Sequence, residues 1–351
     1  MVKVKVVGAT GYGGIGITEL LLQHPQVSIA ALVARDDVGK KICDVYPHLR
    51  GFCELPILAA DDPVAQQPAD VVFFATPDGV AMTAAEAELK KGAKVIDYSG
   101  DFRFTSAERY ADYATRLNKN PVHQSPHLLG KNVYGLAELH APAIQNASLV
   151  GNPGCFAASC ILGLAPAAKA GILAPNSVIC DCKSGVSGAG KKIAQTFHFP
   201  ERSGQINAYR LSGHQHTCEI EQQLSGLANA PVTVTFTAHV LPICRGILST
   251  LYATLPAPMT EADLLAVYSA FYKNAPFIRV MPSTSATGTL HVRGSNFCNL
   301  TVSVDSRTQR MRVVSHIDNL MKGQAANALQ NMNLMCGFAE TTALLRPGFY
   351  P

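Results

Sequence analysis

The sequence has no apolar run approaching about 18 residues, so we expect no membrane-spanning helix. No charged segment followed by an apolar one opens the chain, and its first residues already predict a strand and a turn, which argues against a targeting segment. The formal net charge is only +4, and the basic residues are not gathered into arms or aromatic-containing patches, which disfavours nucleic acid as a partner. We therefore expect a cytoplasmic protein that binds neither membranes nor nucleic acid.

The cysteines lack a pattern as well. Ten are scattered along the chain without the spacing of a disulfide framework, which is typical of reduced thiols in a cytoplasm. Apolar residues, in contrast, are plentiful. They make up 48% of the 351 residues, which is enough for a large core, and the length alone suggests about two domains.

The N-terminal residues predict a βαβ unit. Val2–Val7 predicts a strand, Gly8–Gly14 a turn, Ile15–Gln23 a helix and Val27–Ala34 the next strand. Glycines let the backbone approach a pyrophosphate, and the N-terminus of the following helix attracts its charge. The glycine spacing is GxxGxxG rather than GxGxxG, and a turn without a ligand is the alternative, but the order of the elements favours dinucleotide binding. The candidate cofactor-binding residues are Gly8, Thr10, Gly11, Tyr12, Gly13 and Gly14.

The end of the second strand bears on the choice of dinucleotide. NAD-binding chains usually place Asp or Glu there, whereas this chain has Arg35, with Lys40 close behind. A guanidinium suits the 2′-phosphate of NADP, so both residues are candidate cofactor ligands. Asp36 and Asp37 weaken this inference, and a solvated charged loop is the alternative.

Further α/β units follow. Asp70–Thr76 and Ala93–Ser99 predict buried parallel strands, with a helix over 80–91 between them and a loop-rich, polar stretch over 104–148 after them. In a doubly wound sheet, ligands bind at the carboxyl ends of the strands. Arg103 is therefore a candidate for holding a substrate anion, with an ordinary surface charge as the alternative. The candidate cofactor-binding residues at this edge are Thr76, Pro77 and Ser99.

The candidate nucleophile is Cys155. Gly151–Gly154 predicts a tight turn just ahead of it, and the small apolar residues after it predict a helix. A cysteine at a helix N-terminus lies among unsatisfied N–H groups, which favours the thiolate and lowers the thiol pKa below its usual value of about 8.5. The alternative is a buried structural cysteine, which we expect Cys160 to be. Asn152, in the turn, is a candidate substrate-binding residue.

The strand predicted over Ser177–Cys182 leads into Lys183–Lys192, a loop rich in glycine and serine. Such a loop is either a linker or a backbone cradle for a ligand, and its place directly after a strand favours the cradle. Its candidate cofactor-binding residues are Ser184, Gly185 and Gly188.

Two histidines and a carboxylate lie within the short run SGHQHTCE at 212–219. An HxHxxE run is able to bind a metal, but no further His/Cys set supports such a site, and we expect none. An imidazole acting as general acid or base beside a thiol fits better, while the start of a polar helix is the structural alternative. His214 is the catalytic candidate, and His216 and Glu219 are candidate substrate-binding residues.

The remaining sequence is rich in predicted strands. One helix, over Glu261–Tyr272, is capped by Thr260, and Asn319–Cys336 predicts a final helix. Arg245 lies between two strands, where it is placed to meet an anion. The predicted strands are Val232–Leu241, Gly246–Leu255, Phe277–Met281, Cys298–Val304 and Arg310–Ile317.

Together these patterns predict an α/β plus α+β architecture. We expect residues 1–150 to form a Rossmann dinucleotide-binding domain, completed by the C-terminal segment 319–351. Residues 151–318 are expected to form an α+β catalytic and oligomerisation domain.

Nine motifs resemble the N-acetyl-gamma-glutamyl-phosphate reductase family, the arginine-pathway relatives of aspartate-semialdehyde dehydrogenase and glyceraldehyde-phosphate dehydrogenase. Each motif alone is weak, but nine in the family's order, over nearly the whole chain, are specific. They are the turn over Gly8–Gly14, LQHP at 22–25, GKKICDVYPHLRG at 39–51, DYSGDFRF at 97–104, GNPGC at 151–155, SGVSGAG at 184–190, GHQHTCEI at 213–220, HVLPICRG at 239–246 and NLMKGQAANALQNMN at 319–333.

The resemblance implies an NADP(H)-binding Rossmann domain, a glyceraldehyde-phosphate-dehydrogenase-like α+β catalytic domain, and a last helix that folds back onto the first domain. It implies that Cys155 attacks an acyl phosphate substrate and that phosphate leaves. NADPH would then reduce the thioester to N-acetylglutamate 5-semialdehyde, a step of arginine biosynthesis. Because relatives are oligomers, the resemblance also implies a homo-oligomer, either a dimer or a tetramer.

The resemblance assigns further roles to single residues. It makes His214, in preference to His216, the acid/base and places Asn319 near the nicotinamide. It makes Arg245, with Arg103 as a second candidate, the residue that holds substrate or phosphate.

The chain departs from the family pattern on the substrate side. Phe156-Ala157-Ala158 replaces the usual Tyr-Pro-Thr after the cysteine, and Gln215 replaces the arginine of His-Arg-His. Three alternatives stay open: a lysine-pathway analogue that acts on a carrier-bound aminoadipyl phosphate, an aspartate-semialdehyde dehydrogenase, and an NADP-binding paralogue without catalysis. The GHQH and SGVSGAG runs argue against the second, and the intact Cys155, His214 and Arg245 argue against the third.

Overall fold

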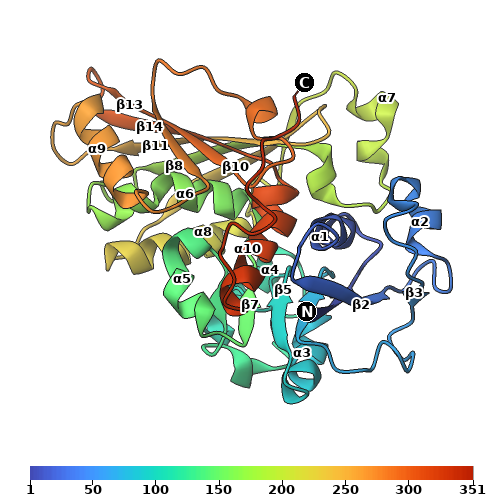
Figure 1. Ribbon diagram of the computed structural model, residues 1–351. Helices are drawn as coiled ribbons and strands as arrows, with labels where there is room; N and C mark the ends of the chain where they lie inside the picture. Colours follow the sequence, from blue (N-terminus) through green and yellow to red (C-terminus); the bar gives the residue numbers. More distant parts are fainter. Residues whose placement is uncertain (351) are drawn as a thin grey trace. The chain divides into compact units, whose positions relative to one another are not determined.

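The computed structural model describes residues 1–350, which divide into two compact units. Unit 1 comprises residues 1–111, 120–153 and 324–346, and unit 2 comprises residues 112–119, 154–323 and those from 347 on. Each unit is built around one seven-stranded sheet (Figure 1). No helix in the described part of the chain is both long and apolar enough to span a membrane.

The sheet of unit 1 is parallel throughout, in the order β3-β2-β1-β4-β5-β7-β6. Its central strand β4 is a run of Val and Phe, and all four of its residues are buried, as a sheet covered on both faces requires. The order reverses direction between β1 and β4, where doubly wound folds bind ligands. The strands are β1 (Val2–Val7), β2 (Val27–Val33), β3 (Ile57–Leu58), β4 (Val71–Phe74), β5 (Lys94–Asp97), β6 (Val133–Tyr134) and β7 (Leu149–Gly151).

The helices of unit 1 include one from the far end of the sequence. The helix α10 packs against α1, α5 and strand β5, so the C-terminal segment belongs to the same unit as the N-terminus. The helices are α1 (Tyr12–Leu21), α2 (Ile42–Val45), α3 (Ala81–Lys90), α4 (Ala107–Arg116), of which the part to residue 111 belongs to this unit, α5 (Ala137–Gln145) and α10 (Ala326–Met335).

Three local predictions were wrong in extent. The first helix begins at Tyr12 rather than Ile15, because two glycines form its first turn, close to the backbone of Gly8. The stretch 104–148 contains long loops, as predicted, but also the helices α4 and α5, which the prediction missed. Helix α4 buries Tyr110, Tyr113 and Ala114 on one side and is polar on the other. The last helix is shorter than predicted, because a π-helical turn, Met321–Ala325, precedes it.

The sheet of unit 2 is mixed, in the order β12-β13-β14-β11-β8-β10-β9, with parallel pairs at β12–β13 and β8–β10. Strand β8 runs on through Gly185, so the first residues of the predicted glycine-serine loop are strand instead. The strands are β8 (Val178–Gly185), β9 (Asn207–Tyr209), β10 (Val234–Leu241), β11 (Ile247–Thr254), β12 (Ile278–Pro282), β13 (Cys298–Asp305) and β14 (Arg310–Ile317).

Helices cover one face of this sheet. Helix α6 (Cys155–Lys169) packs on β11, β13 and β14 and is flanked by α8 (His216–Ala228) and α9 (Glu261–Phe271) (Figure 1). Along β11 the residues alternate between buried ones, which face these helices, and half-buried ones on the opposite face. The side chain of Ser159 on α6 bonds to Ser249 and Ser315 of the sheet at 2.9 Å. The predicted cap of α9 is confirmed, since Thr260 and Asp263 form a capping box.

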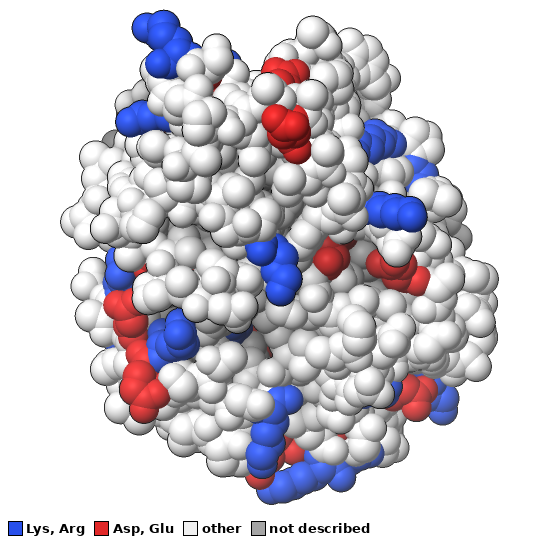
Figure 2. All heavy atoms as spheres, turned by 90° about the vertical axis from the view of Figure 1, so that its left-hand side faces the viewer, with Lys and Arg blue, Asp and Glu red and all other residues white. Residues whose placement is uncertain are grey.

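Charged residues are spread over the surface. On the face shown in Figure 2, Lys and Arg are scattered among uncharged residues and lie beside Asp and Glu in several places. Elsewhere in the structure, oppositely charged neighbours form surface ion pairs, for example Lys90 with Glu86 at 2.9 Å. Exposed pairs of this kind contribute little to stability.

Candidate active site

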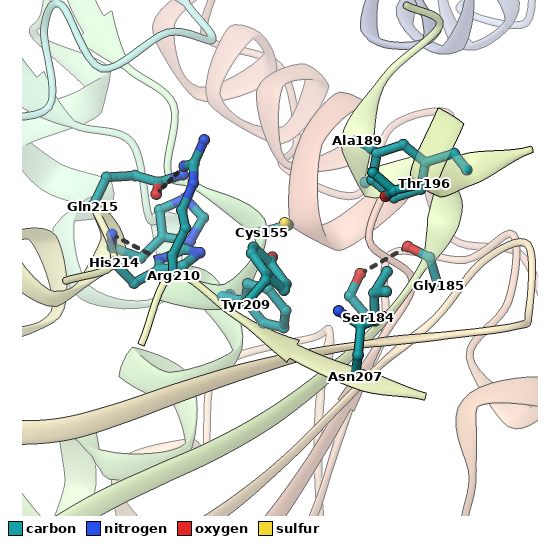
Figure 3. A pocket seen from close by; sticks show the side chains of 15 residues that line it. Cys155, Ser184, Gly185, Ala189, Thr196, Asn207, Tyr209, Arg210, His214 and Gln215 are labelled. Atoms are coloured by element: carbon teal, nitrogen blue, oxygen red, sulfur yellow. Dashed lines mark hydrogen bonds between the residues drawn. The ribbon is translucent and has the colours of Figure 1, made fainter. Parts of the chain in front are cut away.

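A cavity of about 540 Å³ in unit 2 is lined by the predicted nucleophile and the predicted acid/base residue (Figure 3). It brings Cys155 together with His214, which lies 59 positions later in the chain. In the view of Figure 3, Arg210, His214 and Gln215 lie on one side of Cys155, and Ser184 and Gly185 lie on the other. The lining residues are Cys155, Phe156, Ser184, Gly185, Gly188, Ala189, Thr196, Phe197, Asn207, Tyr209, Arg210, His214, Gln215, His216 and Val240.

Cys155 is the first residue of α6 and is half-buried. Gly154 before it has an extended backbone (φ −69°, ψ 148°), and its N–H donates to Oε1 of Glu219 at 2.8 Å. Glu219 is fully buried, so this bond fixes the start of the helix from α8. Gly323 packs directly on the cysteine: a Cβ at 323 would lie 2.8 Å from Cβ of Cys155, which leaves no room for a side chain. The thiol therefore has a defined position at the positive end of a helix.

Cys160 lies further along α6 and, unlike Cys155, is fully buried. Cys160 has no exposed surface, and its Sγ lies 3.4 Å from Sγ of Cys182. Burial raises the pKa of both thiols well above its usual range. The expectation that Cys160 is a structural cysteine is confirmed.

His214 is held among aromatic rings. It contacts Phe156, Tyr209, Phe236 and His216 at centroid distances of 4.8 to 5.9 Å. The backbone N–H of His216 donates to Nδ1 of His214 at 3.2 Å, which places the ring proton on Nε2. Burial, together with His216 and Arg210, lowers the pKa of His214 to about 2. The imidazole is therefore neutral at physiological pH and presents an N–H donor.

The wall beside His214 contains residues that the sequence did not reveal. Tyr209 ends β9 and lines the cavity, and burial next to Cys155 raises its phenol pKa well above the usual value, so the hydroxyl stays protonated. Arg210 follows it. The buried Arg202 orders this wall by donating to Asn207 Oδ1 at 2.7 Å and to backbone carbonyls around it. The available signal was proximity in the sequence, because Tyr209 and Arg210 stand just before the histidine run.

The other sequence candidates of unit 2 lie outside the lining of this cavity. Arg245 forms an ion pair with the fully buried Asp318 at 3.0 Å. Asn319 is buried too; its amide donates to Ser187 Oγ at 2.9 Å, and its carbonyl accepts from the N–H of Gly246 at 2.7 Å. Both residues thus support the loops around the cavity. Within the described chain, no group of three or more His, Cys, Asp or Glu side chains is placed to hold a metal ion.

Two substrate candidates belong to unit 1 and are buried in it. Arg103 donates to the backbone carbonyls of Asn152 and Tyr98. The Asn152 side chain donates to the carbonyl of Gln324 at 3.0 Å and accepts from Asn327 at 2.8 Å. Their contacts join the end of β7 to the segment that begins α10.

The glycine-rich turn of unit 1 packs closely against the chain's own backbone. Gly8 has φ +88°, and a Cβ there would lie 2.3 Å from the carbonyl oxygen of Ala75 after β4. A Cβ at Gly14 would lie 2.1 Å from the carbonyl oxygen of Gly8. Thr10 is buried, and Tyr12 is the exposed first residue of α1. This turn therefore tolerates only glycine at both positions.

Side chains around this turn fall into two groups. The Oγ1 of Thr76 is buried without a hydrogen-bond partner, Pro77 next to it is exposed, and Arg35 is exposed just after β2. Lys40 is in an ion pair with Asp37 at 2.8 Å, and the hydroxyl of Ser99 donates to Asp97 at 2.8 Å. Thr76 and Arg35 thus retain polar groups for a ligand, whereas Lys40 and Ser99 are engaged internally.

Comparison with protein families matches two consecutive segments of the chain to two domain models. Residues 3–147 match the model described as semialdehyde dehydrogenase, NAD binding domain. Residues 155–319 match the model described as semialdehyde dehydrogenase, dimerisation domain.

Several relatives align along the full length. N-acetyl-gamma-glutamyl-phosphate reductase of Moorella thermoacetica is 45% identical over all of both chains. The protein of the same name from Pelotomaculum thermopropionicum is 43% identical over 100% of this chain and 99% of its own.

Solved structures of lower identity share the fold. Aspartate semialdehyde dehydrogenase II of Vibrio cholerae, complexed with ASA, is 17% identical, with a TM-score of 0.71 over 96% of this chain and 98% of its own. Aspartate semialdehyde dehydrogenase of Candida albicans, with NADP, is 16% identical, with a TM-score of 0.65 over the same shares. These similarities confirm the predicted pairing of a Rossmann-type and an α+β domain.

The burial of His214 predicts how stability depends on pH. The unfolded chain takes up a proton on this histidine near pH 6.5, whereas the folded chain does not until far lower pH, so the free energy of unfolding falls as the pH drops below 6.5. We expect His214→Gln to remove up to about 2 kcal/mol of the loss between pH 6.5 and 5, measured by denaturant unfolding at both values. His198→Gln, at an exposed position, is the control. An unchanged pH dependence in His214→Gln would contradict the expectation.

Proposed function

The chain belongs to the N-acetyl-gamma-glutamyl-phosphate reductases of the semialdehyde dehydrogenase family, and from that premise we propose that it reduces N-acetyl-gamma-glutamyl phosphate to N-acetylglutamate 5-semialdehyde and phosphate. NADPH is the proposed reductant, and the step serves arginine biosynthesis. The observation that carries the proposal is the cavity of unit 2, which is lined both by Cys155 at the start of α6 and by the neutral imidazole of His214.

The residues of unit 1 fit a dinucleotide. The turn between β1 and α1 brings backbone N–H groups to a helix N-terminus, and side chains at Gly8 and Gly14 would collide with backbone. The buried, unpartnered hydroxyl of Thr76 lies at the carboxyl end of β4, where a ligand atom can bond to it. We propose that the residues predicted from the sequence around this turn bind the cofactor, with Ser184, Gly185, Gly188 and Asn319 of unit 2 acting at its nicotinamide end.

Arg35 supports NADP over NAD. It is exposed at the end of β2, the position where chains that bind NAD carry an acid for the ribose hydroxyls. Lys40 is close in sequence, but its charge is paired with Asp37. The proposed ligand of the 2′-phosphate is therefore Arg35.

The first proposed step is attack by the Cys155 thiolate on the acyl carbon. The carbon–sulfur bond forms, the bond between the acyl carbon and the phosphate oxygen breaks, and the leaving phosphate takes up one proton from solvent. The contacts of Gly154 with Glu219 and of Gly323 with the cysteine hold the sulfur in place for this attack. In this scheme Glu219 positions the nucleophile.

The second step is reduction of the thioester. When bound, the cofactor would supply the hydride that the thioester carbon accepts. The Nε2–H of His214 is the proposed donor to the oxygen that becomes negative, and the thiolate of Cys155 then leaves as the aldehyde forms. A neutral imidazole suits this role because it donates a hydrogen bond while staying uncharged. A substrate-binding role for His216, which lines the cavity, is part of the proposal. Arg103, Asn152 and Arg245 were predicted to bind substrate, but their side chains bond to other parts of the chain, so no substrate contact is proposed for them.

A homo-oligomer is proposed from the open face of the unit 2 sheet. The residues of β11 that alternate with the helix-covered ones, Leu248, Thr250 and Tyr252, are half-buried, and their neighbours on β8 are Lys183, Asp181 and Ile179. The matching family model is a dimerisation domain. We propose that a second copy covers this face.

Turnover tests the function directly. With N-acetylglutamate 5-semialdehyde, phosphate and NADP, we expect wild type to form NADPH, seen by absorbance, and Cys155→Ala to lose at least about 10³-fold in rate. Cys244→Ala, which removes an exposed thiol, should retain activity. Aspartate semialdehyde should react poorly. No turnover in wild type, or equal rates in Cys155→Ala, would refute the proposal.

The dinucleotide preference tests Arg35. Arg35→Ala should raise the KM for NADP roughly 10- to 100-fold and leave the KM for NAD nearly unchanged, because only NADP has the phosphate that the guanidinium binds. Lys41→Ala is the matched control, since Lys41 pairs with Glu54 at 2.7 Å. Equal effects on both dinucleotides would exclude this role.

Sedimentation tests the oligomer. We expect wild type to sediment as a dimer or tetramer and Thr250→Arg, in the middle of the open face, to shift it toward the monomer. Thr308→Arg in the exposed turn after β13 is the control. A monomeric wild type at micromolar concentration is the outcome that rules the proposal out.

A further inference from the structure

Arg210 is the one lysine or arginine among the residues that line the cavity. The other lining residues are neutral or aromatic, apart from the cysteine and the two histidines. The proposed substrate carries a carboxylate besides its acyl phosphate, and a carboxylate that enters the cavity is stabilised by a cation or by several donors. Within the cavity, Arg210 is the residue able to supply such a charge.

The backbone holds Arg210 in an uncommon conformation. It follows β9 directly, and its φ of +51° lies in the left-handed region, which is unfavourable for a non-glycine residue. The pairing of β9 with β10 keeps the preceding Tyr209 opposite Ala238. The strand pairing therefore fixes the place on the cavity wall where the chain turns at Arg210.

The guanidinium of Arg210 is also fixed by a hydrogen bond to a neighbouring side chain. Its Nη1 donates to Oε1 of Gln215 at 2.5 Å, and Figure 3 shows the two side chains together beside His214. Gln215 stands where the family pattern has arginine, and two arginines in contact would repel each other. In this chain a neutral acceptor at 215 steadies a cation that comes from β9. The influence of Arg210 on the pKa of His214 agrees with this closeness.

We propose that Arg210, steadied by Gln215, binds the α-carboxylate of the substrate and so selects carboxylated acyl phosphates and aldehydes. This inference rests on the proposed function and deepens it. The guanidinium has further N–H groups besides the one bonded to Gln215, enough for a bidentate bond to a carboxylate.

The carboxylate, rather than the phosphate, fits this position. The phosphate is bonded to the carbon that Cys155 attacks, so it must lie next to the sulfur, which is half-buried at the start of α6. The carboxylate lies at the other end of the substrate, beyond three further carbons. Arg210 is an exposed residue of the cavity wall, which suits the remote group.

The test compares two aldehydes in the phosphate-dependent oxidation. One is N-acetylglutamate 5-semialdehyde, and the other is 4-acetamidobutanal, the same molecule without its carboxylate. For Arg210→Gln we expect kcat/KM with the first aldehyde to fall roughly 10- to 100-fold, mainly through KM, and kcat/KM with the second to change less than about 2-fold. Arg210→Lys should recover part of the loss. Gln215→Leu should show a smaller loss with the same preference.

The following control and outcomes distinguish failure of the carboxylate assignment from failure of the proposed function. Arg307→Gln removes an arginine that is 85% exposed in the turn after β13 and should leave both aldehydes unaffected. An equal loss with both aldehydes, or a raised KM for phosphate in Arg210→Gln, would overturn the carboxylate assignment while leaving the proposed function intact. Wild type that does not oxidise N-acetylglutamate 5-semialdehyde would overturn the proposed function and this assignment with it.

Discussion

The catalytic unit depends on the hydrogen bond between the N–H of Gly154 and the buried carboxylate of Glu219. It joins the start of α6 to α8 and so determines where Cys155 lies relative to the histidines. Because His216 begins α8 and Glu219 lies in its first turn, the same helix supplies the carboxylate and the imidazole environment. Phe156 follows the cysteine and packs on both histidine rings. Cys155 and the histidines are thus placed by one helix–helix contact.

A second buried carboxylate orders the other side of the cysteine. Asp318 accepts hydrogen bonds from Arg245 and from the backbone N–H groups of Gly294 and Leu320. These bonds fix the chain entering the π-helical turn, whose Gly323 packs on Cys155. Such turns are frequent at functional sites because they shift residues out of regular helical register. The charge of Arg245, which the sequence suggested for a substrate anion, is compensated here.

Burial also determines the chemistry that the imidazole can perform. In water a histidine exchanges its proton near neutral pH, but the aromatic surroundings of His214 disfavour the charged form. A neutral imidazole of this kind is able to donate a hydrogen bond, which is the role proposed for it above. Among the residues that line the cavity, the one lysine or arginine is Arg210, whereas Cys155 lies at the positive end of the α6 dipole.

Local interactions let the sequence by itself predict the βαβ unit, the glycine turn and the cysteine at a helix start, because each depends on residues that are neighbours in the chain. The sequence also determined the family, through nine motifs in order. Only the tertiary structure decided which charged side chains are paired within the protein and which ones line the cavity. Arg245 is neutralised by Asp318, 73 positions later, and Tyr209 and Arg210 reach the cavity through pairing of β9 with β10. The physical reason is that such pairings join distant segments, so periodicity and spacing along the chain carry no signal of them.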